Sequence, residues 1–200
     1  MTMESVQRSI AMTAFSLARY LDVYFYHIVI SCALLIAYNV FVRKDWDSIL
    51  FKAASDGNVE LMATALQHSA DVNFLAAGEC TPLIIACMNS REEAVRLLLE
   101  TSAGACKLDL FDVNGRTALH AAVQAGNEVI VRLLLDHGAD VRAFDNDGNT
   151  PLIAAATAGR VEALQLLLGT GRVDIQWKNK EGLNALIGGP VGMLLVISPL

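Results

Sequence analysis

The six residues T-P-L-I-A-A at 150–155 decide the fold, because similar strings recur at nearly constant distances along the chain. T-A-L-H-A-A occupies 117–122 and T-P-L-I-I-A occupies 81–86, while looser copies begin at Ser48 and Asn184. Successive copies therefore start 33, 36, 33 and 34 residues apart. A constant period of about 20–50 residues indicates a protein built from stacked structural repeats.

Each copy predicts two helices separated by a tight turn and followed by an extended finger. Pro82 and Pro151 suit the first position of a helix, where a missing N–H costs nothing, and the threonine before each is a favoured N-cap. A glycine or serine nine residues after the threonine position marks the turn, and a leucine-rich stretch seven residues later gives the second helix a buried face. One unit cannot bury its apolar side alone, so the units are expected to stack.

These strings make the chain resemble the ankyrin-repeat family, whose units have this period and a T-P-L-H-x-A start. The resemblance covers 46–187 and implies an all-α ankyrin-repeat solenoid that binds proteins. The sequence departs from the family pattern at Ser90, where glycine is usual, and at Gly188-Gly189-Pro190, where the fifth unit breaks. The expected repeats are 48–80, 81–116, 117–149, 150–183 and a partial fifth from 184.

The composition excludes two classes of protein. Apolar residues make up 54% of the chain, which is more than a disordered chain contains. The formal net charge of −6 argues against a nucleic-acid binder, because phosphate contacts need clustered Lys and Arg. Residues 1–44 carry four basic and two acidic groups, whereas 45–200 carry eleven basic and nineteen acidic groups. This acidic repeat region favours a basic protein partner through electrostatic steering.

An apolar stretch separates an N-terminal segment, 1–23, from the repeats. Tyr24–Val42 carries no formal charge, is long enough to cross a bilayer as a hydrophobic helix, and is followed by Arg43-Lys44. One interpretation is a membrane anchor that leaves the repeats facing the cytosol. The other is a helix that caps the open side of the first repeat in a soluble cytoplasmic protein. The tail, 188–200, is apolar and indicates a fifth repeat that is cut short.

The junction N-V-F-V-R-K-D at 39–45 carries a second resemblance. It is similar to the junction in fungal ankyrin proteins that have an F-box-like leader, although the leader's usual Leu-Pro start is absent. This resemblance implies an alternative function, that of a soluble adaptor in ubiquitin-ligase recruitment.

No motif of a catalytic, cofactor or metal site occurs in the sequence. The strings G-x-x-x-x-G-K-[ST], H-E-x-x-H and G-x-S-x-G are all absent, so we expect no enzyme, no cofactor and no bound metal. His120 stands at the T-x-L-H position, where the resemblance implies a hydrogen bond to neighbouring backbone. Cys87 replaces the apolar Val123 and Ala156 of later repeats, which predicts a small buried apolar side chain.

Aromatic side chains near the finger tips are the candidate binding residues. Phe111 and Phe144 precede their threonine position by six residues, and Phe74 and Trp177 precede theirs by seven. Stacked repeats bring equivalent positions together, so the rings form either an exposed partner-binding row or a set buried between neighbouring fingers. Polar finger residues complete the candidate set: Asn114, Arg116, Asp147 and Asn149.

Overall fold

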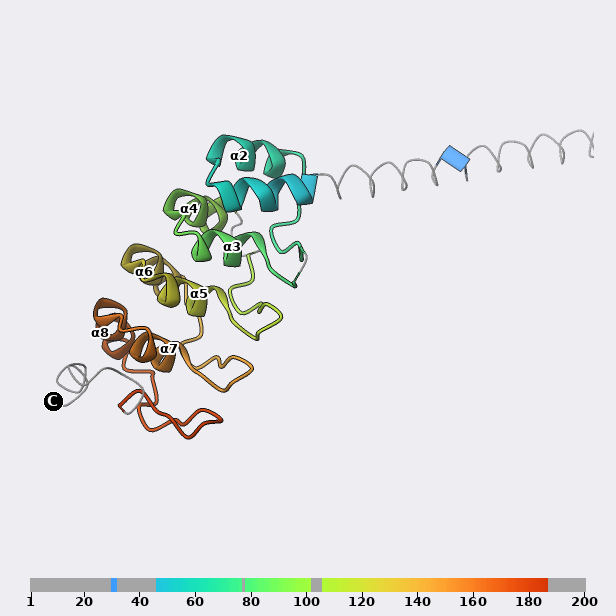
Figure 1. Cartoon of the computed structure of the whole chain (residues 1–200). Coiled ribbons are helices and arrows are strands. Elements are labelled where there is room, and N and C mark those ends of the chain that lie inside the picture. The colour runs from blue at the N-terminus through green and yellow to red at the C-terminus, as the bar shows by residue number, and fades with distance from the viewer. Residues whose placement is uncertain (1–29, 32–45, 77, 102–105, 187–200) are drawn as a thin grey trace, which may run out of the picture. The chain divides into compact units, whose positions relative to one another are not determined.

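The computed structural model describes residues 30–31, 46–76, 78–101 and 106–186 (Figure 1). The chain divides into two compact units, Met1–Arg43 and Lys44–Leu200, and the second contains nearly all of the described residues. Its regular structure is a series of helix pairs, each followed by a finger, as the periodicity predicts.

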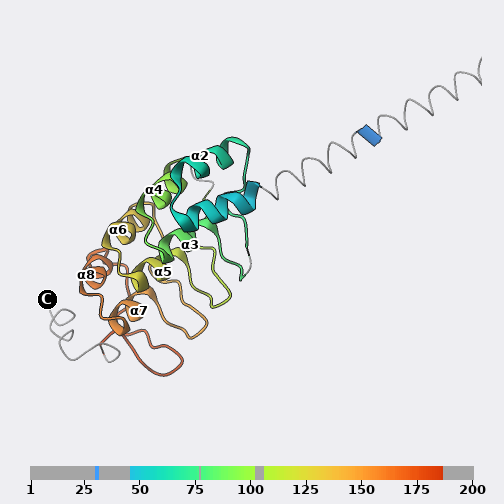
Figure 2. The same ribbon diagram turned by 45° about the horizontal axis from the view of Figure 1, so that its top comes forward.

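The helices of successive pairs pack in two layers. The pairs are a helix over 46–56 with α2 (Val59–Gln67), α3 (Pro82–Met88) with α4 (Glu92–Thr101), α5 (Ala118–Ala125) with α6 (Glu128–Asp136), and α7 (Pro151–Thr157) with α8 (Val161–Gly169). Among the first helices, α3 packs against α5 and α5 against α7, while α2, α4, α6 and α8 pack in the same order. Both views show the fingers leaving the layer of first helices on one side (Figures 1 and 2).

The first helices begin where the sequence predicts. Thr81 Oγ1 accepts a hydrogen bond from the Ile84 N–H at 3.1 Å, and Thr150 Oγ1 accepts one from the Ile153 N–H at 3.4 Å. A proline follows each of these threonines at the first helical position. An N-cap of this kind contributes about 1 kcal/mol to helix stability, so these two repeats carry their own start signals.

A residue with left-handed backbone separates the two helices of each pair. Gly57, Gly126 and Gly159 have φ values of 79°, 78° and 71°, which glycine adopts without steric cost. Ser90 occupies the same place in the second pair with a φ of 54°. The nine-residue spacing thus located the turn correctly, and Ser90 adopts there a conformation that is costly for a residue with a side chain.

The buried side chains form one cluster that runs through the stack. The first helices contribute small residues, such as Ala122 and Ala155, which let neighbouring helices approach closely. The second helices contribute the middle leucine of each leucine triplet: Leu98, Leu134 and Leu167. Because the cluster crosses every boundary between pairs, the stability of each pair depends on its neighbours.

Two predicted segments fall largely outside the described residues. Of Tyr24–Val42, the structure describes Ile30 and Ser31, which are helical and exposed, so the N-terminal hydrophobic helix stays a prediction. In the ranges that are described, no helix is both long and apolar enough to cross a bilayer. The fifth repeat is described as far as Leu186, with Asn184 and Ala185 buried, and the tail at 188–200 lies beyond it.

Candidate partner-binding surface

The fingers are numbered one to four: residues 71–80, 107–116, 140–149 and 174–183. Fingers two, three and four are hairpins, and each is held by one Asp or Asn side chain. In finger two, Asp112 Oδ1 accepts hydrogen bonds from the N–H groups of Asn114 and Arg116, at 2.9 and 3.0 Å. Asp145 in finger three and Asn179 in finger four make the same pair of bonds. A side-chain oxygen that accepts from positions two and four residues on fixes the turn locally.

Neighbouring finger tips are joined by backbone hydrogen bonds, which we call the tip ladder. Its bonds run from the Val113 N–H to Gly78 O (3.1 Å), from the Asn146 N–H to Asn114 O (2.9 Å), and from the Lys180 N–H to Asp147 O (2.9 Å). Gly115 permits this close approach, because a Cβ there would lie 2.6 Å from Asn146 Oδ1. The ladder therefore holds the described fingers in fixed positions relative to one another.

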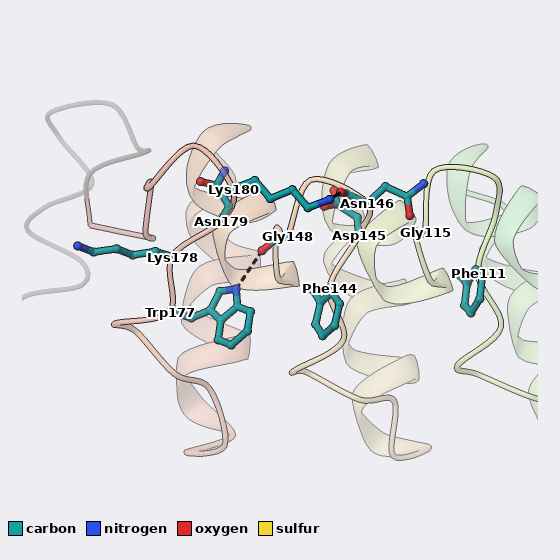
Figure 3. Close-up of a pocket in the computed structure, with 10 residues that line it drawn as sticks. All are labelled: Phe111, Gly115, Phe144, Asp145, Asn146, Gly148, Trp177, Lys178, Asn179 and Lys180. Carbon is teal, nitrogen blue, oxygen red and sulfur yellow. Dashed lines mark hydrogen bonds between the residues drawn. The ribbon is translucent and has the colours of Figure 1, made fainter.

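Three aromatic rings lie on the same side of fingers two to four (Figure 3). Phe111 and Phe144 are 57% and 61% exposed, and Trp177 is 41% exposed. Phe144 and Trp177 stack with ring centroids 5.9 Å apart and planes 18° apart. The Trp177 Nε1–H donates to Gly148 O at 2.9 Å, which fixes the indole. The three rings thus form an exposed row. Phe111 and Phe144 are not buried between neighbouring fingers, which was the alternative expectation.

Phe74 does not share the register of Phe111 and Phe144. The backbone hydrogen bond that closes each hairpin starts at Ala76 in finger one and at Asp112 in finger two. The residues before them, Leu75 and Phe111, are therefore equivalent. Leu75 is 52% exposed, whereas Phe74 is half-buried. Leu75 is not among the predicted residues because its side chain is not aromatic, although a count of six residues back from Thr81 finds it.

A groove lies beside the aromatic row. We call it the finger groove; its volume is about 590 Å³, and its lining includes the three rings together with Asp145, Lys178 and Lys180. A second hollow of about 530 Å³ is also bounded by Phe144 and Trp177. The stacked pair therefore forms a wall shared by two concave regions.

Arg116, one of the predicted binding residues, is engaged within its own finger. Its Nε and Nη2 donate to Asp112 Oδ2 at 3.0 and 2.7 Å, and its Nη1 donates to Gln124 Oε1 at 3.0 Å. Burial raises the pKa of Asp112, but hydrogen bonds from the Arg116 side chain and from two backbone N–H groups outweigh it and hold that pKa below its usual value. Arg116 therefore connects the finger to α5.

The other polar candidates divide between structural and exposed positions. Asn149 Nδ2 donates to Asp145 Oδ2 at 3.1 Å, and its Oδ1 accepts from Asn179 Nδ2 at 2.8 Å, so it joins fingers three and four. Asn114 and Asp147 stand at the tips with exposed side chains, while their backbone carbonyls belong to the tip ladder. Of the four polar candidates, Asn114 and Asp147 therefore present their side chains most openly to a partner.

His120 bonds neighbouring backbone at the end of finger three, as its position in the repeat implied. Its Nε2 lies 3.0 Å from Asn149 O, which only accepts hydrogen bonds, so Nε2 carries the proton. Its Nδ1 then accepts from the Thr117 N–H (3.3 Å) and lies 2.9 Å from Thr117 Oγ1. Burial lowers the pKa of His120, and this effect exceeds the opposing influence of the bond to Asn149 and of the Asp145 carboxylate. The imidazole is therefore neutral near pH 7.

The described cysteines have raised pKa values. Cys87 is fully buried, as predicted, and burial raises the pKa of its thiol. Burial also raises the pKa of Cys106 to about 11 and, to a smaller extent, that of Cys80. A thiol that stays protonated is a poor nucleophile and a poor metal ligand. Among the described residues, no three His, Cys, Asp or Glu side chains gather in a way that would hold a metal ion.

A family model for ankyrin repeats, in three copies, matches residues 26–112 and 102–179. The chain belongs to the ankyrin-repeat family. Ankyrin repeats act mainly as protein-interaction modules, so protein binding is the function that the family membership supports, and the fold alone does not name a partner.

Similar curated ankyrin-repeat relatives include three long proteins. "Transient receptor potential cation channel subfamily A member 1" of Homo sapiens is 37% identical over 108 residues, which are 51% of this chain and 9% of that protein. "Ankyrin repeat and SAM domain-containing protein 6" of Rattus norvegicus is 37% identical over 93 residues, 46% of this chain and 10% of that protein. "Putative E3 ubiquitin-protein ligase XBAT31" of Arabidopsis thaliana is 33% identical over 91 residues, 46% of this chain and 20% of that protein. The chain thus matches only a small part of each relative.

Proposed function

We propose that this ankyrin-repeat chain binds a protein partner through its fingers and the adjoining concave face of the first helices, by association without turnover. The observation that carries the proposal is the exposure of Phe111, Phe144 and Trp177 in one row beside the finger groove. Aromatic residues are enriched in the cores of protein interfaces, and contiguous exposed apolar patches mark interaction sites.

The rigidity of the fingers supports this proposal. Binding is weakened by the entropy of ordering loops and side chains, and the tip ladder has already fixed the fingers. Trp177 is held in addition by its bond to Gly148 O and by its stack on Phe144. An aromatic side chain that becomes buried in an interface commonly contributes about 2 kcal/mol or more to the binding free energy.

A peptide library displayed on phage tests the proposal without knowledge of the partner. Binders are selected on the full chain, and their affinity is then measured for the wild type and for a Phe111→Ser/Phe144→Ser variant. We expect the wild type to enrich binders and the variant to bind them about 30-fold more weakly or worse. A loss of about 2 kcal/mol of binding free energy corresponds to that factor, because 1.4 kcal/mol is a factor of ten in affinity.

The matched control replaces apolar side chains of similar exposure away from the fingers. Leu61→Ser/Val129→Ser changes side chains on α2 and α6 that are 40% and 43% exposed. It should leave the affinity unchanged. The proposal fails if binders survive the aromatic substitutions, or if those substitutions greatly lower the thermal stability, because the rings would then be structural.

A second candidate function places the same module at a membrane. Its support is the charge-free stretch Tyr24–Val42 before Arg43-Lys44, together with a human relative that is named as a cation channel subunit. The opposing observation is that the family match begins at residue 26, inside this stretch, which favours a repeat cap.

Alkaline extraction of membranes separates the anchor from the cap. The full chain is compared with a shortened chain that begins at Asp45. If only the full chain stays in the pellet, and detergent releases it without aggregates, the stretch is an anchor. If the full chain is extracted and the shortened chain unfolds, the stretch caps the first repeat. The adaptor in ubiquitin-ligase recruitment, which draws support from residues 39–45 and from the name of the plant relative, would require this second outcome.

A further inference from the structure

We infer that the finger groove takes an acidic peptide segment, in which an apolar side chain packs on the aromatic rings and nearby carboxylates pair with Lys178 and Lys180. The inference rests on the proposed binding function and names the chemistry of the partner. It comes from the charged groups in the lining of the groove, which are two lysines and a single aspartate, Asp145.

Asp145 is already engaged within its own finger. Its Oδ1 accepts hydrogen bonds from the N–H groups of Asp147 and Asn149 at 3.0 and 2.8 Å, and its Oδ2 accepts from Asn149 Nδ2 at 3.1 Å. These three donors occupy most of the acceptor capacity of the carboxylate. Asp145 keeps its charge, but the lysines outnumber it in the lining and have N–H donors to offer a ligand.

The two lysines extend from finger four in opposite directions (Figure 3). Lys180 reaches from finger four towards finger three, where its Nζ donates to Asn146 O, and Lys178 extends away from Phe144 (Figure 3). Both side chains are exposed. Because an ammonium has three donors, Lys180 can hold its bond to Asn146 and still donate to a ligand. The arrangement suits carboxylates on both sides of an apolar side chain.

The net negative charge of the repeats and the lysines of the finger groove affect binding in different ways, because the lysines contact the ligand and most of the acidic groups do not. At physiological salt, exposed charges further apart than about 8 Å are largely screened. The net negative charge of 45–200 therefore affects the rate of encounter, while the bound state depends on groups in contact with the ligand. The whole-chain charge predicts a basic partner, and the lining of the groove favours an acidic one.

The test uses synthetic peptides drawn from the phage selection. One enriched peptide is compared with a counterpart in which every Asp and Glu is replaced by Asn and Gln, using calorimetric titration against the full chain. We expect acidic residues to be enriched among the binders, and the amide counterpart to bind about fivefold more weakly or worse, as expected for loss of one or two exposed ion pairs.

Charge reversal then locates the contact. Lys178→Glu/Lys180→Glu should weaken the acidic peptide by about tenfold or more and change the amide counterpart by less than about twofold. Lys52→Glu/Lys107→Glu makes the same change in net charge at exposed lysines outside the groove, and should have little effect. Lys178→Glu is also measured alone. The Lys180 ammonium bonds Asn146 O within the protein, so its loss could also change the fingers, whereas Lys178 extends away from that bond.

The outcomes separate this inference from the proposed function. Binders that are neutral or basic, yet lost in Phe111→Ser/Phe144→Ser, would overturn the acidic partner and leave the binding module in place. Equal effects of the two lysine pairs would also overturn the acidic partner alone. A failure to enrich any peptide, or binders indifferent to the aromatic substitutions, would overturn both.

Discussion

The side chain of Arg91 in the second repeat lies directly over Gly57 of the first. Its Cδ is 2.9 Å from the point that a Cβ on Gly57 would occupy, and its Nε donates to Ser55 O at 3.1 Å. Arg160 lies over Gly126 in the same way and donates to a carbonyl oxygen near the end of α5 at 3.2 Å. A cation at the C-terminal end of a helix bonds the last carbonyls and interacts favourably with the helix dipole. The glycine of one repeat and the arginine of the next are therefore a matched pair.

Gly126→Ala should destabilise the chain more than Gly159→Ala. The φ values are 78° and 71°, so both substitutions introduce backbone strain of about 1–2 kcal/mol. At Gly126 the new Cβ would also lie 2.8 Å from Arg160 Cζ, whereas nothing lies within 4 Å at Gly159. Urea unfolding of the two variants measures the difference. Equal losses would show that Arg160 moves aside without cost.

Ser90→Gly should stabilise the chain. Ser90 has a φ of 54°, and its replacement removes strain of about 1 kcal/mol, partly offset by the greater freedom of glycine in the unfolded chain. The next repeat has Asn127 in place of the arginine, and Asn127 bonds Glu92 at 2.9 Å, so no arginine contact changes. A rise in the thermal midpoint is expected. Ser48→Gly, within the helix over 46–56, is the control and should lower it.

Gly115→Ala should disrupt the tip ladder between fingers two and three. The added Cβ would meet Asn146 Oδ1 at 2.6 Å and Asn146 N at 2.8 Å. Amide hydrogen exchange at Asn146 should therefore become faster, because its N–H loses the bond to Asn114 O. Gly182→Ala, at the same turn position of finger four, has no neighbour within 4 Å and isolates the effect of backbone strain. Unchanged exchange at Asn146 in Gly115→Ala would contradict the prediction.

Stability should fall on mild acidification through His120. Its folded pKa lies below the ordinary value of 6.5, so the unfolded chain binds a proton more readily. The contribution of the neutral imidazole is therefore complete above about pH 6.5 and is lost as the pH falls through the folded pKa. Asp112, whose pKa lies below 3.8, affects stability only in a more acidic range.

Denaturant unfolding of the wild type and of His120→Gln, at several pH values between about 7 and 5, measures this effect. The free energy of unfolding of the wild type should fall as the pH is lowered from about 7 to about 5. The variant should be less stable at pH 7, because it lacks the imidazole bonds to Asn149 and Thr117, and it should vary less with pH. Parallel curves for the two proteins would rule out His120 as the source.

Periodicity predicted the helix pairs and the finger turns, because each depends on residues close in sequence. The caps at Thr81 and Thr150 are of this kind. The candidate site was predicted less completely, because side-chain engagement depends on neighbouring repeats. Arg116 is a residue type that often contributes to interfaces, yet its guanidinium already donates hydrogen bonds to Asp112 and Gln124. Spacing alone did not show this.

The aromatic row shows the same division. Phe111 and Phe144 follow from a count along the sequence, and both are exposed. Trp177 stands one position out of that register and joins the row because its ring stacks on Phe144. Such a contact arises only when two fingers lie side by side, so its geometry required the structure.

The tip ladder itself is made by main-chain N–H and C=O groups, and the side chains of Asn146, Asn149 and Lys180 add further bonds between fingers. Exchanging a tip side chain that makes none of these bonds, such as that of Val113 or Asp147, therefore leaves the backbone link to the neighbouring finger intact. Substitutions at exposed tip positions can therefore change the surface offered to a partner without changing the backbone that carries it. The same chain thus offers a template for selecting new specificities, with variation confined to exposed tip residues.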